Sequence, residues 1–301
     1  MIAARQIAFG KAAGKKEETP AYWGLCFTAE EAGSTVAMQV NKSSAPTVTL
    51  ETSYDGEIWE PFSVGETTIT LPKVGDKIYF RAGSGGNTKF ANSVSEYNCF
   101  SMMGVVAASG NIMSLLDGEN MTDALPGTYC YASMFKGCTS LVNAPELPAT
   151  TLADNCYASM FNGCTSLAQA PELPATTLAI NCYSNMFNRC TSLVQAPELP
   201  VTTLANNCYR VMFSYCTSLT QAPELPATTL ATFCYYGMFM GCRNIDCIEC
   251  SFEAFSSATL QWLKGVSSTG TFICPTALGT NETIQRGLSY CPNGWTVINK
   301  G

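Results

Sequence analysis

The sequence contains no histidine, few charged residues and no long apolar run. The 301 residues include no His, and 13% of them are charged while 47% are hydrophobic. Without His there is no Ser-His or Cys-His catalytic pair, no His-ligated metal site and no usual proton shuttle at neutral pH. Plentiful apolar residues exclude intrinsic disorder. A net charge of −7 argues against nucleic-acid binding, which depends on Lys and Arg neutralising phosphates.

No stretch reaches the roughly 18 consecutive apolar residues of a membrane-spanning helix, so membrane insertion is not expected. Arg5 interrupts the apolar residues at the N-terminus, and no signal-peptide core is visible, whether one was removed or never used. Residues 1–19 are interpreted as a solvated, flexible tail. The alternative is that residues 1–20 anchor the chain to a larger assembly.

A 26-residue repeat dominates the second half of the chain. Residues 130–155 and 156–181 are identical at 22 of 26 positions, and four full copies and one truncated copy cover 130–250. A fixed period of this length predicts a solenoid, in which each coil buries its apolar face only against its neighbours. Pro171 and Pro174 favour extended chain. The stretch 156–164 lacks Pro and allows one or two helical turns, so each coil combines a short strand with a short helical or irregular segment, as in leucine-rich repeats.

The regions on either side of the repeats differ from the repeats in composition. Alternating stretches at 47–52, 67–71 and 77–81, with an Asp55-Gly56 turn, predict about seven short strands and an immunoglobulin-like β-sandwich over 20–95. Residues 96–129 are interpreted as an entry segment that caps the first coil, and 251–301 as a C-terminal cap in which 271–273 and 295–298 are expected to form strands. The predicted fold class is β-rich or α+β: an N-terminal β-sandwich, then a leucine-rich-repeat solenoid of 26-residue coils, then a cap.

Within the repeats, the segment from Met160 to Leu167 and the segment Ala170-Pro171-Glu172-Leu173-Pro174 resemble the repeats of BspA-like leucine-rich-repeat proteins. The stretch 74–81 resembles the segment that often precedes such arrays, and 293–297 resembles their C-termini. The resemblance implies surface exposure and adhesion or ligand recognition, usually without catalysis. Members of the family normally carry an export signal, which this chain does not show. Similar repeats occur in phage tail proteins, which need no such signal, so a virion or tail component is the alternative.

Ten of the sixteen cysteines fall in two columns of the repeat. The columns are Cys130, Cys156, Cys182, Cys208 and Cys234, and Cys138, Cys164, Cys190, Cys216 and Cys242. Cβ vectors that run parallel on stacked coils do not face each other as a disulfide requires, so we expect buried free thiols. A bridge within one coil, such as Cys130 to Cys138, is the alternative. The cluster of Cys242, Cys247 and Cys250 lacks a fourth ligand and is interpreted as a degenerate last coil, not a zinc site.

Two further columns have a structural and a functional interpretation. Carboxylates recur at Glu146, Glu172, Glu198 and Glu224, which suggests either a solvated edge, which we favour, or a site for Ca²⁺ or a cationic ligand. Tyrosines recur at Tyr131, Tyr157, Tyr183, Tyr209 and Tyr235, which suggests either a packing ladder, which we favour, or a binding platform. No metal and no cofactor are predicted.

Three columns vary between copies in volume and charge, and we expect them to face solvent. They run Ala132, Ala158, Ser184, Arg210 and Tyr236; then Gly137, Gly163, Arg189, Tyr215 and Gly241; then Asp154, Ile180, Asn206 and Thr232. Arg and Tyr are favoured at binding hot spots. Arg189, Arg210, Tyr215 and Tyr236 are therefore the candidate ligand-binding residues, although drift on an exposed surface gives the same pattern. The expected function is non-enzymatic recognition or adhesion at a cell surface, or in a virion, with a host or bacterial surface protein or glycan as partner.

Overall fold

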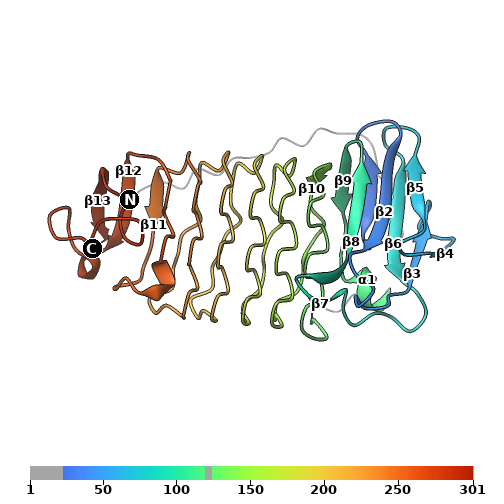
Figure 1. Ribbon diagram of the computed structural model, residues 1–301, viewed down its shortest axis with the longest axis horizontal. Helices are drawn as coiled ribbons and strands as arrows, with labels where there is room; N and C mark the ends of the chain where they lie inside the picture. The colour runs from blue at the N-terminus through green and yellow to red at the C-terminus, as the bar shows by residue number, and fades with distance from the viewer. Residues whose placement is uncertain (1–22, 119–123, 301) are drawn as a thin grey trace, which may run out of the picture.

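A computed structural model describes residues 23–118 and 124–300, so the predicted N-terminal tail lies outside the described residues. The molecule is elongated, with a β-rich region at one end, the repeated segments side by side in the middle, and three further strands at the other end (Figure 1). Helix is scarce: among the described residues there are only α1 (Ser114–Asp117) and two 3-10 turns, at Ser257–Thr259 and Thr276–Leu278. The fold is therefore β-rich.

Two sheets form the N-terminal region. One has the strand order β10-β9-β1-β6-β3-β4 and the other β5-β2-β8-β7. The bounds are β1 (Cys26–Ala29), β2 (Ser34–Val40), β3 (Leu50–Ser53), β4 (Glu60–Phe62), β5 (Thr68–Leu71), β6 (Lys77–Ala82), β7 (Ala91–Ser93), β8 (Glu96–Met103), β9 (Val106–Ser109) and β10 (Leu141–Asn143). The ring of Phe27 on β1 meets that of Phe100 on β8 at 4.8 Å, so the two sheets share an aromatic core. Seven strands lie within 20–95, the number that the sequence predicts.

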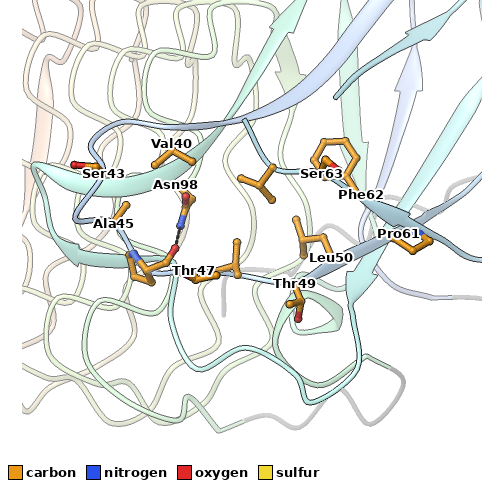
Figure 2. Close-up of a pocket in the computed structure, with 13 residues that line it drawn as sticks. Val40, Ser43, Ala45, Thr47, Thr49, Leu50, Pro61, Phe62, Ser63 and Asn98 are labelled. Carbon is orange, nitrogen blue, oxygen red and sulfur yellow. Dashed lines mark hydrogen bonds between the residues drawn. The ribbon is translucent and has the colours of Figure 1, made fainter. Parts of the chain in front are cut away.

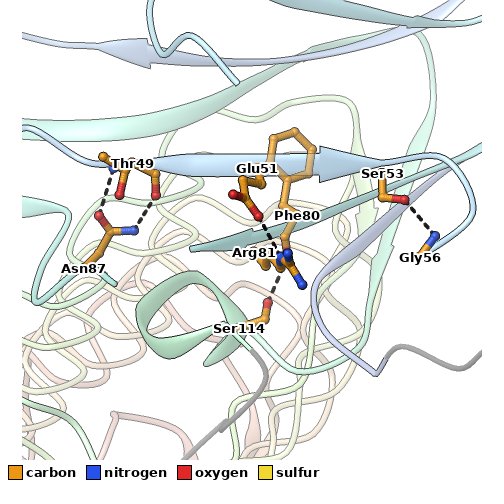
Figure 3. A network of polar contacts seen from close by, with 8 residues as sticks. All are labelled: Thr49, Glu51, Ser53, Gly56, Phe80, Arg81, Asn87 and Ser114. Carbon is orange, nitrogen blue, oxygen red and sulfur yellow. Dashed lines mark hydrogen bonds and ion pairs between the residues drawn. The ribbon is translucent and has the colours of Figure 1, made fainter. Parts of the chain in front are cut away.

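Side chains fasten the loops of this region to its strands (Figure 3). The Asn87 amide exchanges two hydrogen bonds of 2.9 Å with the backbone of Thr49 and donates a third to the Leu115 carbonyl. The Ser114 hydroxyl, on α1, donates to the Phe80 carbonyl at 3.0 Å. Arg81 pairs with Glu51 at 2.8 Å. Because the bonds of Asn87 and Ser114 reach toward α1, they hold the chain that leads into the repeats against the sheets.

The boundaries expected at residues 95 and 251 do not coincide with breaks in hydrogen bonding. Strand β8 pairs with β2, and β9 pairs with β1, although both follow residue 95. At the other end, β11 (Cys247–Glu249), β12 (Gly270–Pro275) and β13 (Trp295–Lys300) form one parallel sheet. The predicted strands at 271–273 and 295–298 are confirmed. Parallel pairing thus continues through most of the segment expected to be a cap.

Successive copies of the repeat are joined by parallel contacts at equivalent positions. Isolated bridges link Asn143 to Gln169, Gln169 to Gln195, and Gln195 to Gln221, each 26 residues apart. In the stretch 130–138 and its equivalents, backbone N–H groups alternate: one donates to the next copy, as Tyr131 does to Cys156, and the following one donates three residues back within its own copy, as Ala132 does to Tyr129. This stretch is irregular, not helical, because every second N–H group is used between copies.

Ladders of buried side chains run along the axis of the stack. The tyrosine rings of neighbouring copies stack at 5.9–6.1 Å, and their exposed fractions are at most 2%. A parallel ladder of phenylalanines starts at Phe100 and Phe135, whose rings are 5.4 Å apart. All sixteen cysteines are free, and all ten in the two columns are buried. The packing interpretation is therefore confirmed for the tyrosine column and for the two cysteine columns.

The second cysteine column is also a hydrogen-bond ladder. The Cys164 thiol donates to the Phe135 carbonyl at 3.0 Å, and Cys190, Cys216 and Cys242 repeat this contact with the preceding copy at 2.9–3.1 Å. Burial raises the pKa of Cys190 to about 12. A small apolar side chain with one weak donor suits this position, because it fills the core and occupies a carbonyl oxygen.

Candidate functional site

The candidate residues lie on segments that we call the turn segments: residues 129–138, 155–164, 181–190, 207–216 and 233–242, with a sixth at 257–265. The sixth is recognised from its hydrogen bonds, because Gly237 donates to Leu260 and Gly241 to Lys264 just as earlier copies do to theirs. In each of the first five turn segments the backbone enters the left-handed region at three residues spaced four apart, and the sixth has two such residues, Gln261 and Gly265. In the first copy these residues are Tyr129, Ser133 and Gly137, with φ of 58°, 61° and 77°.

Left-handed backbone favours glycine, because any side chain there approaches the following carbonyl. In the column of residue 137, Gly137, Gly163 and Gly241 follow this rule. Arg189 and Tyr215 break it, with φ of 65° and 60°. Each costs of the order of 1 kcal/mol relative to glycine. In this column, two copies therefore carry large side chains where the backbone disfavours them, and Tyr129, Val211 and Phe233 do so at the other left-handed positions.

Both of these side chains face outward and form a stack along the axis. The Arg189 guanidinium lies over the Tyr215 ring, 6.0 Å from its centroid. The Tyr215 ring in turn covers Gly241, where an added Cβ would lie 2.6 Å from its Cδ1 atom. Arg189 is exposed, and 44% of Tyr215 is exposed. Three successive copies thus contribute the cation, the ring and the space that the ring needs.

A second pair lies five residues earlier in the repeat. The Arg210 guanidinium lies 4.9 Å from the centroid of the Tyr236 ring, and Phe233 meets the edge of that ring at 5.9 Å. Both Arg210 and Tyr236 are half-buried. The structure therefore places all four predicted residues on adjacent copies as two stacked Arg–Tyr pairs.

The expectation that all three variable columns face solvent was wrong for the column of residue 132. Ala132, Ala158 and Ser184 are buried, with exposed fractions of 0%, 2% and 6%. Tyr97 of β8 belongs to the same buried cluster as the two alanines. Arg210 and Tyr236, in the same column, are half-buried and contact each other. The other two columns are exposed or half-buried throughout.

The guanidinium groups of Arg189 and Arg210 keep their donors available. Within residues 23–118 and 124–300, no carboxylate lies within 4 Å of either group, and neither donates a side-chain hydrogen bond. Arg presents five N–H donors in a planar fork that fits carboxylate and other oxyanions. Stacking on a ring leaves the edge of that fork open. The N–H donors of both guanidinium groups are therefore free of partners among the described residues.

The remaining candidates from the sequence are the glutamate column and the cluster of Cys242, Cys247 and Cys250. The four column glutamates are exposed, and the side chain of Lys300 contacts Glu224 at 3.6 Å and Glu249 at 2.8 Å. In the described part of the chain, no three His, Cys, Asp or Glu residues are grouped as a metal site requires. Cys247 is exposed and Cys250 is buried. The pKa of Cys247 is raised by partial burial and by the neighbouring Asp246 and Glu249 carboxylates, which disfavours the reactive thiolate.

A hollow of about 430 Å³ in the N-terminal region has no counterpart in the sequence predictions. It lies between the end of β2, the loop that leads into β3, and the segment after β4, and is lined mainly by apolar side chains (Figure 2). Asn98 stands at its wall and donates to the Pro46 carbonyl at 2.8 Å. Its Oδ1 atom is buried and has no partner among the described residues. Because the Oδ1 atom of Asn98 has almost no accessible surface, a molecule in the hollow could not contact it, and it does not mark a ligand site.

The comparisons with known proteins identify no relative. No family model, no curated protein and no solved structure matches the chain. None of the helices in the described residues has the length and hydropathy needed to cross a bilayer.

Proposed function

We propose that the chain is a non-enzymatic recognition protein in which a β-sandwich presents a solenoid of leucine-rich 26-residue coils, and that the turn segments bind a surface protein or glycan. The continuous hydrogen bonds between copies and the unbroken aromatic ladders support a solenoid. The shared core of the two N-terminal sheets supports a sandwich. The resemblance to BspA-like proteins agrees with both.

The observation that carries the functional proposal is the position of Arg189 and Tyr215. Both occupy left-handed sites that the other copies fill with glycine. Backbone strain that the fold does not require is a reason to suspect function, since stability is commonly sacrificed at binding sites. Their pairing with each other, and that of Arg210 with Tyr236, gives rigid aromatic and cationic groups of the kind that dominate binding energy.

The test is to restore the common residues of the repeat. The triple variant Arg189→Gly, Arg210→Ala, Tyr215→Gly gives these positions the residues found in other copies. It should melt at the same temperature as the wild type or higher, because two left-handed residues are relieved. Screened against bacterial and host surface proteins and a glycan panel, the wild type should bind a ligand that the triple variant does not.

A matched control changes exposed residues of a connecting segment, Val194→Ala and Glu198→Ala. This control should bind like the wild type. Equal binding by the wild type and the triple variant would remove the turn segments from the function. The alternative of a virion or tail component, anchored through residues 1–20, predicts a symmetric oligomer in light scattering, whereas an adhesin of the proposed kind predicts a monomer.

A further inference from the structure

Charges of opposite sign lie in different segments of the repeat region, although the second copy, residues 156–181, carries no cation. Between residues 124 and 268 there are five cations, and four of them lie in turn segments while the fifth directly follows one. These are Lys136, Arg189, Arg210, Arg243 and Lys264. The same stretch has eight carboxylates, and none lies in a turn segment. They are Glu146, Asp154, Glu172, Glu198, Glu224, Asp246, Glu249 and Glu253. In a chain of net charge −7, the turn segments form a cationic stripe.

The stripe is not neutralised within the protein. No ion pair joins any of its five cations to a carboxylate in residues 23–118 and 124–300. Arg189, Arg243 and Lys264 are exposed, and Lys136 and Arg210 are half-buried. Neighbouring copies are 5.3–6.1 Å apart, as their stacked rings show, which is less than the Debye length of about 8 Å at physiological salt. The second copy carries no cation, so the potentials add chiefly over the third to sixth turn segments, which hold Arg189, Arg210 and Lys264, with Arg243 directly after the fifth.

The groups between the cations favour a hydroxyl-rich partner. The third copy presents three half-buried amides, Asn181, Asn185 and Asn188, next to Arg189. Asn188 donates to the Asn185 carbonyl oxygen at 3.4 Å and Asn185 donates to the Ser184 hydroxyl at 3.0 Å, so two of the three amides are linked. Amides both donate and accept, as a sugar hydroxyl requires.

From this arrangement we infer that the ligand of the turn segments is a linear glycan with negative charges repeated along its length. The inference rests on the proposed function, because it names the ligand class of the same surface. Carboxylate and sulfate groups share the relevant chemistry, since both accept paired N–H donors from a guanidinium. A linear polymer with repeated charges can contact cations that are distributed over several turn segments, such as Arg189, Arg210 and Lys264, whereas a compact ligand reaches fewer of them.

The experiment measures binding of the full chain to five probes at about 50 mM and about 200 mM salt, a range over which polyanion contacts weaken strongly. The probes are polygalacturonate, dextran sulfate, neutral dextran, poly-L-glutamate and single-stranded poly(dT). The test variant is Arg189→Gln with Arg210→Gln. The control is Lys42→Gln with Lys73→Gln, which makes the same change in net charge at exposed lysines outside the stripe.

The wild type should bind polygalacturonate or dextran sulfate, and not dextran, with lower affinity at the higher salt concentration. The test variant should lose at least about tenfold in affinity and the control less than about twofold. Equal binding of dextran, equal or tighter binding of poly-L-glutamate or poly(dT), or an equal loss in the control would overturn the inference. A neutral glycan or a protein whose binding the glycine-restoring triple variant abolishes would overturn it while leaving the proposed function in place. If no ligand binds the triple variant more weakly than the wild type, both the inference and the proposed function fail.

Discussion

The ring of Tyr215 occupies the space above Gly241 in the next copy, so that a Cβ at residue 241 would lie 2.6 Å from Cδ1 and 2.9 Å from Cε1 of the ring. Gly137 has the same role in its own copy, but a Cβ there would have no neighbour within 4 Å. The two glycines have nearly equal φ, 79° and 77°. The two sites differ in their neighbours, because the Tyr215 ring packs over Gly241 and no side chain packs over Gly137.

Gly241→Ala should therefore be more harmful than Gly137→Ala. Both variants incur the left-handed strain of about 1 kcal/mol, but only the first also displaces the ring of Tyr215. The free energy of unfolding, from urea titrations, should fall further for Gly241→Ala, and Tyr215→Gly in the same chain should remove the difference. Equal losses for the two single variants would show that the ring moves away freely.

Val211 is a β-branched residue at a left-handed position, with φ of 57°, where the preceding copy has Asn185 at 58°. Because asparagine tolerates this backbone and valine does not, Val211→Asn should stabilise the protein by roughly 0.5–1 kcal/mol. The control Val194→Asn, at an exposed site outside the left-handed positions, should change stability by less than about 0.5 kcal/mol. Destabilisation by Val211→Asn would mean that the apolar contact of Val211 outweighs the strain.

Leu173 is buried, with 7% of its surface exposed, in the segment that connects two turn segments. Truncation of a buried leucine leaves a cavity, so Leu173→Ala should cost about 2–5 kcal/mol of unfolding free energy. Ile180→Ala, at a side chain that is 44% exposed, is the comparison and should cost much less. A loss below about 0.5 kcal/mol for Leu173→Ala would place this residue outside the core.

The thiols should be unreactive in the native protein. Fourteen of the cysteines are buried, Cys99 is half-buried and Cys247 is exposed. With a thiol reagent at pH 8, only Cys247 and, more slowly, Cys99 should react before unfolding, and denatured protein should release all sixteen thiols without any reductant. Few free thiols in denatured, unreduced protein would mean that the columns are cross-linked.

Stability should fall in alkaline solution. Burial raises the pKa of Cys182, Cys190 and Cys242 to about 12, from an ordinary value of 9.0. The folded state thus retains protons that the unfolded state releases above pH 9, so this contribution is fully present below pH 9 and declines from there toward pH 12. The expected loss is roughly 1 kcal/mol per thiol and pH unit. Unfolding by urea at pH 7, 8, 9 and 10, with reductant present, measures it, and a flat profile from pH 8 to 10 would contradict the burial of these thiols.

Much of the architecture follows from the repeat in the sequence. The 26-residue period alone places equivalent residues on neighbouring copies, and because cysteine and tyrosine keep their positions in every copy, their burial could be predicted. Alternation and turn residues likewise located strands β3, β5, β6, β12 and β13. The candidate residues Arg189, Arg210, Tyr215 and Tyr236 were found because they interrupt otherwise constant columns.

Only the tertiary structure decided how those residues are arranged. The left-handed residue at every fourth position is hidden in the sequence, because Arg189, Val211 and Tyr215 occupy it as well as glycine. The sixth turn segment was not predicted because Ala258 and Trp262 stand where the other copies have Cys and Met. These residues also follow Cys234 and Met238 at a spacing two residues shorter than the repeat. Burial of Ala132 depends on β8, which is distant in sequence. A repeated sequence determines which residues are equivalent, whereas the conformation of each turn, and what packs over it, depends on hydrogen bonds and contacts between copies.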